Sequence, residues 1–152
     1  MEPESKNLKL DADRIAPNLY LGSYPKKYEM GGLKAMGFDT LVLCAEELQA
    51  PTRFNDLKVY RIPMDDIEDV EAIPFGPLIQ TAKKISDDLA EGKNVLVTCA
   101  MGINRSAMTL GLALRMRYPE LTGDQAVALI RKGRFPTLLN ETFEEVVRRM
   151  KL

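Results

Sequence analysis

The sequence predicts a single-domain α/β protein whose central, mostly parallel sheet is flanked by helices. Three observations support this fold class. The chain has 152 residues, which suits one domain with a sizeable core. Short runs rich in β-forming residues alternate with helix-like runs along the chain, as in parallel α/β sheets. No internal repeat or low-complexity linker interrupts this alternation.

Each expected element follows from a local pattern. The predicted strands are 19–21, 40–43, 58–62 and 94–98. Residues 74–90 carry apolar side chains at helical spacing, whereas 107–116 are apolar almost all round, which is typical of a helix buried at the centre of a domain. Thr122 with Gln125 forms a capping box that predicts a helix over 122–132, and Asn140 is expected to cap the last helix. Residues 1–12 are expected to be a flexible segment ahead of a domain at 13–152.

Composition excludes several classes of protein. Apolar residues make up 45% of the chain, charged residues 28%, and the net charge is −1 without a long basic run. This argues against nucleic acid or an anionic membrane as the main partner. The start of the chain lacks an apolar stretch, so no signal peptide is expected, and no segment is long enough to span a bilayer. Two distant cysteines do not form a disulfide scaffold, which points to a reducing, cytoplasmic setting.

The segment after the run at 94–98 carries the strongest functional signal. Cys99 follows this run, Arg105 comes six positions later, and an apolar helix-like segment follows. Where a strand turns into a helix, inward-pointing backbone N–H groups and the helix dipole bind a dianion. That field favours a thiolate, and an arginine fork binds two phosphoryl oxygens. The segment therefore predicts a phosphate-binding loop with Cys99 as nucleophile; the alternative is an ordinary buried thiol beside a chance arginine.

The residues around Arg105 are the expected phosphate contacts. Gly102 keeps the turn tight and lets the ligand approach the backbone. The interior of the loop carries no charged side chain that could bind additional phosphates of a substrate. The expected substrate-binding positions are Ala100, Met101, Gly102, Ile103, Asn104 and Ser106.

The whole pattern resembles the Cys-x5-Arg loop of the protein tyrosine phosphatase superfamily, and the flanking chain is similar to its dual-specificity branch. Residues 15–23 are similar to the opening strand of that family, 62–66 to its general-acid loop, and 134–136 with 140–143 to its closing segment. The likeness spans about residues 15 to 147. It implies a cysteine-phosphatase fold, with residues 13–152 as the catalytic domain, and a phosphocysteine intermediate without metal or cofactor.

One departure from the family pattern affects the nucleophile. The residue before the catalytic cysteine is normally histidine in this family, but here it is Thr98, and the chain contains no histidine. This excludes Ser-His-Asp and Cys-His activation and histidine metal sites. The Cys99 thiolate must therefore be favoured by the loop amides, Arg105, the helix start and a hydroxyl from Thr98 or Ser106. We expect the thiolate form of Cys99 to be less favoured than in a relative that has the histidine.

The resemblance also assigns the general acid. A carboxylic acid must protonate the leaving group and then activate water against the phosphocysteine. The alignment favours Asp66, with Asp65 as the alternative, and a solvated acidic loop is the expected state of Glu68 and Asp69. Ser106 is expected to hydrogen-bond the sulfur, to cap the following helix, or to do both.

Cys44 has two interpretations. It is most simply a small apolar side chain that ends a buried strand. However, residues 43–46 are similar to a segment of the phosphatase-and-tensin homologue whose cysteine can pair with the catalytic one. On that resemblance, Cys44 is a possible redox partner of Cys99, resolving a sulfenic acid as a reversible disulfide.

The predicted function is hydrolysis of phosphomonoesters, namely phosphotyrosine and phosphoserine or phosphothreonine in proteins, or a small phosphomonoester, by a monomer. Two other classes are open. A weakened, phosphatase-like module would bind phosphorylated partners without turnover, and a rhodanese-type sulfurtransferase would also use a cysteine loop, although its spacing fits poorly. The basic side chains expected to rim the pocket are Arg14, Lys26, Lys27, Arg53 and Arg134.

Overall fold

The structure is a computed structural model that describes residues 2–3, 10–49 and 57–152. Its centre is a five-stranded sheet with strand order β1-β2-β5-β3-β4. Only β1 pairs antiparallel, with β2, and the β2–β5, β5–β3 and β3–β4 pairs are parallel. The strands are β1 (Ala12–Ala16), β2 (Leu19–Ser23), β3 (Thr40–Ala45), β4 (Lys58–Met64) and β5 (Val95–Cys99). The predicted α/β class with a mostly parallel sheet is confirmed.

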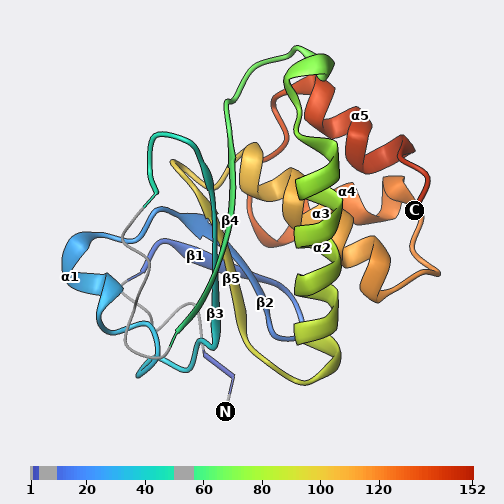
Figure 1. Cartoon of the computed structure of the whole chain (residues 1–152). Coiled ribbons are helices and arrows are strands. Elements are labelled where there is room, and N and C mark those ends of the chain that lie inside the picture. Colours follow the sequence, from blue (N-terminus) through green and yellow to red (C-terminus); the bar gives the residue numbers. More distant parts are fainter. Residues whose placement is uncertain (1, 4–9, 50–56) are drawn as a thin grey trace.

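Helices cover the two faces of the sheet unequally, as Figure 1 shows. Four helices and the larger apolar core lie on one face, and the short α1 with a smaller apolar cluster lies on the other. Among the described residues, no helix is both long and apolar enough to cross a membrane. The helices are α1 (Lys27–Met30), the 3₁₀ helix η2 (Val70–Ala72), α2 (Phe75–Ala90), α3 (Arg105–Arg117), α4 (Gly123–Gly133) and α5 (Glu141–Arg149).

The predicted helix starts are confirmed by their caps. Thr122 Oγ1 accepts a hydrogen bond from Gln125 N at 3.0 Å, and Gln125 Oε1 accepts one from Thr122 N at 2.9 Å. Asn140 Oδ1 accepts from Phe143 N at 3.1 Å at the start of α5. Between these ends, the first ten residues of α3 are buried, in agreement with its apolar sequence. This central helix forms a rigid support behind the loop that follows β5.

The start of the chain differs from its predicted form. Residues 15–23 were expected to resemble one opening strand, but the backbone reverses after Ala16 and forms two antiparallel strands. The turn uses Asn18 with φ 65°, a conformation that asparagine tolerates better than most residues. Residues 4–9 of the predicted flexible segment lie outside the described residues. Glu2, before that gap, accepts hydrogen bonds from Arg14 and from the Asn18 backbone.

Candidate active site

Three parallel strands end at the same edge of the sheet and bring the predicted site residues together. Cys99 is the last residue of β5, Cys44 is the penultimate residue of β3, and Asp66 follows the end of β4 by two residues. In open α/β sheets this carboxyl edge is where ligands bind. The three segments are distant in the sequence, so the sheet topology itself assembles the site.

A pocket of about 220 Å³ opens at this edge. Most of the predicted site residues line it, including the proposed nucleophile, arginine and acid. Leu139 lines it as well, and nothing in the sequence pattern had marked that residue. The lining residues are Asp66, Cys99, Ala100, Met101, Ile103, Asn104, Arg105 and Leu139.

The sulfur of Cys99 lies at the floor of the pocket. The residue is only 4% exposed, and its Sγ lies 3.0 Å from Ser106 Oγ, within hydrogen-bonding distance for a thiol and a hydroxyl. Ser106 is the second residue of α3, and the cap position belongs to Asn104, so the predicted capping role of Ser106 is wrong. Its hydroxyl is directed to the sulfur instead.

Thr98 contacts neither the sulfur nor the pocket lining. Side chains alternate between the faces of a strand, and Cys99 and Val97 belong to the core on the helix-rich face. Thr98 therefore points to the opposite face, where its hydroxyl donates to Val42 O at 2.9 Å. Of the two hydroxyls that the sequence offered for stabilising the thiolate, only that of Ser106 reaches the sulfur.

Arg105 is held from outside the loop by an acidic partner that the sequence did not reveal. Its two terminal nitrogens donate to the two carboxylate oxygens of Glu47 at 2.5 and 2.8 Å, and one also donates to Met64 O at 3.1 Å. The hydrogen bond from Arg105 lowers the pKa of Glu47 to about 2 and raises the pKa of the arginine. Within the described residues, Arg105 Nε is buried without a partner, which leaves one donor for an oxyanion.

Gly102 fixes the path of the loop. Its φ is 69°, and a Cβ there would lie 2.5 Å from Gly22 C and 2.6 Å from Gly22 O. At Gly102 the loop thus lies close to the backbone of β2. The predicted approach of a ligand to Gly102 stays a prediction. Only glycine satisfies both the backbone conformation and the contact.

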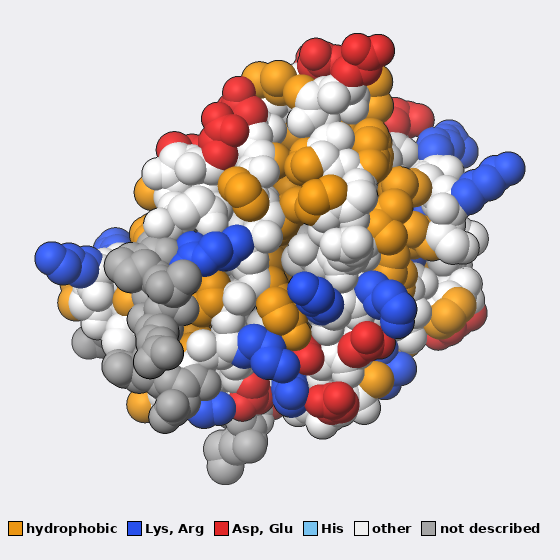
Figure 2. All heavy atoms as spheres, in the orientation of Figure 1, with side chains coloured by type: hydrophobic (Ala, Val, Ile, Leu, Met, Phe, Trp, Pro, Cys, Tyr) orange, Lys and Arg blue, Asp and Glu red, His pale blue; other side chains and the backbone are white. Residues whose placement is uncertain are grey.

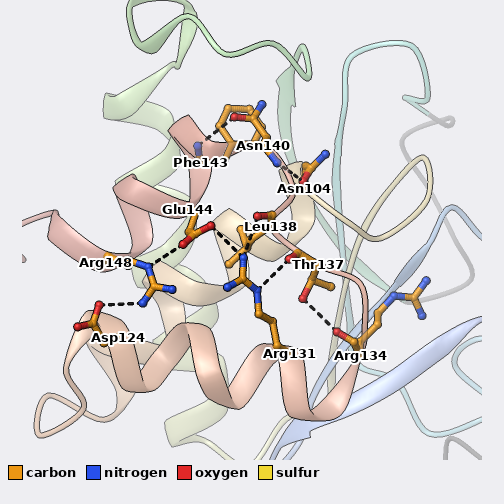
Figure 3. Close-up of polar contacts among 10 residues, drawn as sticks. All are labelled: Asn104, Asp124, Arg131, Arg134, Thr137, Leu138, Asn140, Phe143, Glu144 and Arg148. Carbon is orange, nitrogen blue, oxygen red and sulfur yellow. Dashed lines mark hydrogen bonds and ion pairs between the residues drawn. The ribbon is translucent and has the colours of Figure 1, made fainter.

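Arg134 braces the same loop from its outer side. It donates to the carbonyl oxygens of Met101 and Gly102 at 2.8 and 2.9 Å. It also donates twice to Asp11, at 2.9 and 3.0 Å, and once to Asp13, at 2.9 Å. Figure 3 shows its side chain directed away from the polar cluster around Arg131. The rim role predicted for Arg134 is therefore not what the structure shows, since its donors are already occupied.

The other basic side chains expected at the rim are accounted for separately. Arg14 forms an ion pair with Glu2 at 2.7 Å. Lys26 and Lys27 are exposed at the start of α1. Arg53 lies outside the described residues. Among the described residues, the pocket is lined by one cation, Arg105.

The two adjacent aspartates differ in their surroundings. Asp65 Oδ1 accepts from the backbone N–H of Asp66 at 2.8 Å, so it is turned toward its own loop. Asp66 lines the pocket and accepts hydrogen bonds from two amide side chains, those of Asn104 and Asn140, both at 2.9 Å. The geometry thus favours Asp66 over Asp65 as the carboxylate near Cys99. Glu68 and Asp69 are exposed, and Figure 2 shows acidic side chains at this end of the molecule.

The segment after α4 is tied down next to the pocket. Arg131 donates to Thr137 O, Leu138 O and Glu144 Oε1 at 2.9 to 3.1 Å (Figure 3). Leu138 N donates to Ile103 O at 2.8 Å, and Leu138 is held at φ 56°. A left-handed leucine costs about 1–3 kcal/mol. The surrounding contacts maintain that strained residue directly before Leu139, which lines the pocket.

Cys44 lies beneath the site and is fully buried. Its Sγ is 3.5 Å from Thr109 Oγ1, and burial raises the pKa of the thiol.

No group of three or more acidic or thiol side chains within the described parts of the chain lies close enough together to hold a metal ion.

Comparisons with known proteins identify the family of the chain. Residues 19–151 match the family described as "Dual specificity phosphatase, catalytic domain". Mouse protein phosphatase Slingshot homolog 3 is 32% identical over 125 residues, which make up 81% of this chain and 18% of that protein. Mouse dual specificity protein phosphatase 12 is 27% identical over 135 residues, or 88% of this chain and 39% of that protein. The chain thus spans less than half the length of these two relatives.

Solved structures share the fold at lower sequence identity. Human DUSP28 superposes with a TM-score of 0.76 at 21% identity, covering 97% of this chain and 94% of the other. The human tyrosine phosphatase-like serine/threonine/tyrosine-interacting protein gives a TM-score of 0.76 at 21% identity, covering 91% and 94%. The family match extends over most of the chain and contains the loop, the acid segment and the closing segment. The chain therefore belongs to the dual-specificity protein phosphatase family.

Proposed function

We propose that this protein hydrolyses phosphomonoesters through a phosphocysteine intermediate at Cys99. The single observation that carries the proposal is the pocket that Cys99, Arg105 and Asp66 line together. In the first step the Cys99 sulfur attacks phosphorus, the S–P bond forms and the P–O bond to the leaving group breaks. Asp66 gives its proton to the departing oxygen. Arg105 Nε and the amides at the start of α3 stabilise the phosphoryl oxygens.

The second step releases phosphate with the same residues. Asp66, now ionised, accepts a proton from water while the water oxygen attacks phosphorus and the S–P bond breaks. The Ser106 hydroxyl, 3.0 Å from the sulfur, stabilises the departing thiolate. The cycle regenerates the thiolate and the protonated acid without any metal or organic cofactor.

We further propose phosphotyrosine and phosphoserine or phosphothreonine in proteins as the substrates. The side chains of Met101 and Leu139 stand 66% and 60% exposed, so apolar surface surrounds the opening. Arg105 is the one cation that lines the pocket in the described parts of the chain, which suits a single phosphate group. Small phosphomonoesters with an aromatic leaving group fit the same description.

A second candidate is a phosphatase-like module that binds phosphorylated partners with little turnover. Two observations favour it: Thr98 stands where the family has histidine and does not contact the sulfur, and Glu47 already occupies two nitrogens of Arg105. Retention of Cys99 and of the nearby Asp66 favours catalysis.

Phosphate release separates the two candidates. The parent protein, Cys99→Ser and Thr98→His are assayed on p-nitrophenyl phosphate and on phosphotyrosine, phosphoserine and phosphothreonine peptides. Release by the parent that disappears in Cys99→Ser supports the hydrolase. Peptide binding without release, with turnover gained in Thr98→His, would instead favour the binding module.

We also propose that Cys44 is the redox partner of Cys99. The strands β3 and β5 are parallel neighbours with Leu43 opposite Thr98, so the two cysteines follow at equivalent positions, and both side chains belong to the same core cluster. Peroxide would oxidise the Cys99 thiolate to a sulfenic acid, and the Cys44 thiol would displace water to form the disulfide. Mass spectrometry should then show a loss of two hydrogens that is absent in Cys44→Ser. Equal over-oxidation of Cys99 in both proteins would exclude the pairing.

A further inference from the structure

The start of α3 lacks the side-chain cap that its sequence offers. Asn104 occupies the cap position, where asparagine commonly accepts a hydrogen bond from the first turn, yet it makes no such bond. Its Oδ1 accepts from Asn140 N at 2.9 Å, and its Nδ2 donates to Asp66 Oδ2 at 2.9 Å. The first backbone donors of α3 are therefore left for a ligand. The Asn104 side chain faces the loop at 65–72 that carries Asp66, here called the acid loop.

Asn140 approaches the same carboxylate from the other side. Its Nδ2 donates to Asp66 Oδ1 at 2.9 Å and to Ile67 O at 3.0 Å, while its Oδ1 caps α5 through Phe143 N. Figure 3 shows Asn104 and Asn140 side by side, with the hydrogen bond from the Asn140 backbone joining them. Each carboxylate oxygen of Asp66 thus has its own side-chain amide donor, and the backbone N–H of Asn140 donates to the side-chain oxygen of Asn104.

The acid loop lies on the surface of the protein. Residues 65–72 are exposed, and a further contact to the closing segment runs from Thr142 Oγ1 to Glu68 O at 2.8 Å. That bond ties the loop to α5 without touching Asp66. By contrast, the two asparagines bind the carboxyl group itself and are anchored on α3 and α5.

We propose that Asn104 and Asn140 are positioning residues that hold the carboxyl group of Asp66 over the phosphate pocket. The inference rests on the proposed phosphatase function and goes beyond it by assigning two further residues to the proton-transfer step. The asparagines act through Asp66, so their contribution depends on how much the leaving group needs a proton. A phenolate that departs readily needs little help, whereas a poorer leaving group depends strongly on a well-placed acid.

The test compares two substrates that differ in the leaving group. Release of p-nitrophenolate and of phenol from their monophosphates is measured for the parent, Asn104→Ser, Asn140→Ser and Asp66→Asn. Serine keeps a capping hydroxyl for α5 but lacks the amide donor. We expect kcat on phenyl phosphate to fall about tenfold more than on p-nitrophenyl phosphate in each serine variant, a part of the roughly 10²–10⁴ that a positioned acid contributes.

A double-mutant cycle tests whether Asn104 acts through Asp66. In the Asp66→Asn background, Asn104→Ser should add no further selective loss on phenyl phosphate, because the group that it positions is gone. Thr142→Val is the matched control: it removes the other bond between the acid loop and the closing segment and should leave the ratio of the two rates unchanged.

Three results would overturn the inference: an equal loss on both substrates, a selective loss that persists with Asp66→Asn, or the same selective loss in Thr142→Val. A failed proposed function gives a different result, because the parent itself would then release neither phenol. If Asn140→Ser disrupts α5, as thermal unfolding would reveal, Asn104→Ser decides the matter alone.

Discussion

The two walls of the pocket are built in different ways. The wall formed by β5, the loop at 100–104 and α3 is part of the core: Cys99 and Arg105 are 4% and 5% exposed. The wall formed by the acid loop at 65–72 is exposed and is held by side-chain hydrogen bonds. Substitutions in the first wall should therefore affect folding and activity together, whereas substitutions in the second should affect activity alone.

The largest expected effect is that of Gly102→Ala. The added Cβ would meet the backbone of Gly22 at 2.5 Å, and alanine disfavours φ 69°. Strain and overpacking together should lower the free energy of unfolding by about 3 kcal/mol and abolish turnover. Gly76→Ala in α2 is the control, since a Cβ there has no atom within 4 Å, and helix propensity should make it neutral or stabilising. Denaturant unfolding measures both; a stable and active Gly102→Ala would remove the distinction between the walls.

Asp66→Asn should lower the activity while leaving the stability almost unchanged. Loss of the acid should reduce kcat on phenyl phosphate by about 10²–10⁴, while the free energy of unfolding stays within about 0.5 kcal/mol because the side chain is exposed. Asp65→Asn, whose carboxylate faces its own loop, should lose little activity. If Asp65→Asn lost more than Asp66→Asn, the assignment of the acid would have to be reversed.

Arg134→Met probes the outer brace of the first wall. The substitution removes five hydrogen bonds, two of them to loop carbonyls. We expect a loss of about 2 kcal/mol in stability and a raised KM, since the loop that binds phosphate loses its support. Arg149→Met is the control, because its ion pair with Glu145 is exposed and should contribute less than 1 kcal/mol. Thermal unfolding and steady-state kinetics of both variants test this, and equal stability losses would contradict it.

The smallest expected effect is a pH dependence at Glu47, the exposed partner of Arg105. The pKa of Glu47 is lowered to about 2 from an ordinary 4.5, so the ion pair stabilises the fold above pH 4.5 and this contribution is lost as the pH falls toward 2. Because the Glu47 side chain is 52% exposed, the contribution should not exceed about 1 kcal/mol. Glu47→Gln should be less stable than the parent at pH 6, and the difference should shrink on acidification. A difference that is constant from pH 6 to pH 3 would contradict the ion pair.

Local patterns in the sequence were sufficient for β2, β3, β4 and β5, the buried helix α3 and the caps at Thr122 and Asn140, because each of these depends on neighbouring residues, whereas β1 was missed. Within the candidate site, Cys99 and Arg105 could be predicted from one segment, whereas Asp66, on another segment, was predicted only through the resemblance to the family. Glu47 and Asn140 were missed as partners because they lie 58 and 74 residues from Arg105 and Asp66 and meet them only through the sheet topology. The side of the strand on which Thr98 lies, opposite to Cys99, follows from the alternation of side chains along β5.

The contact between Arg134 and Asp11 joins positions that are 123 residues apart. During synthesis the strand that carries Cys99 leaves the ribosome well before Arg134 does, so the nascent chain contains the nucleophile while its loop still lacks the outer brace. The loop can be braced by Arg134 only after α4 has been made and Arg134 has met Asp11. Competence to bind phosphate should therefore arise late in biogenesis, nearly together with completion of the domain.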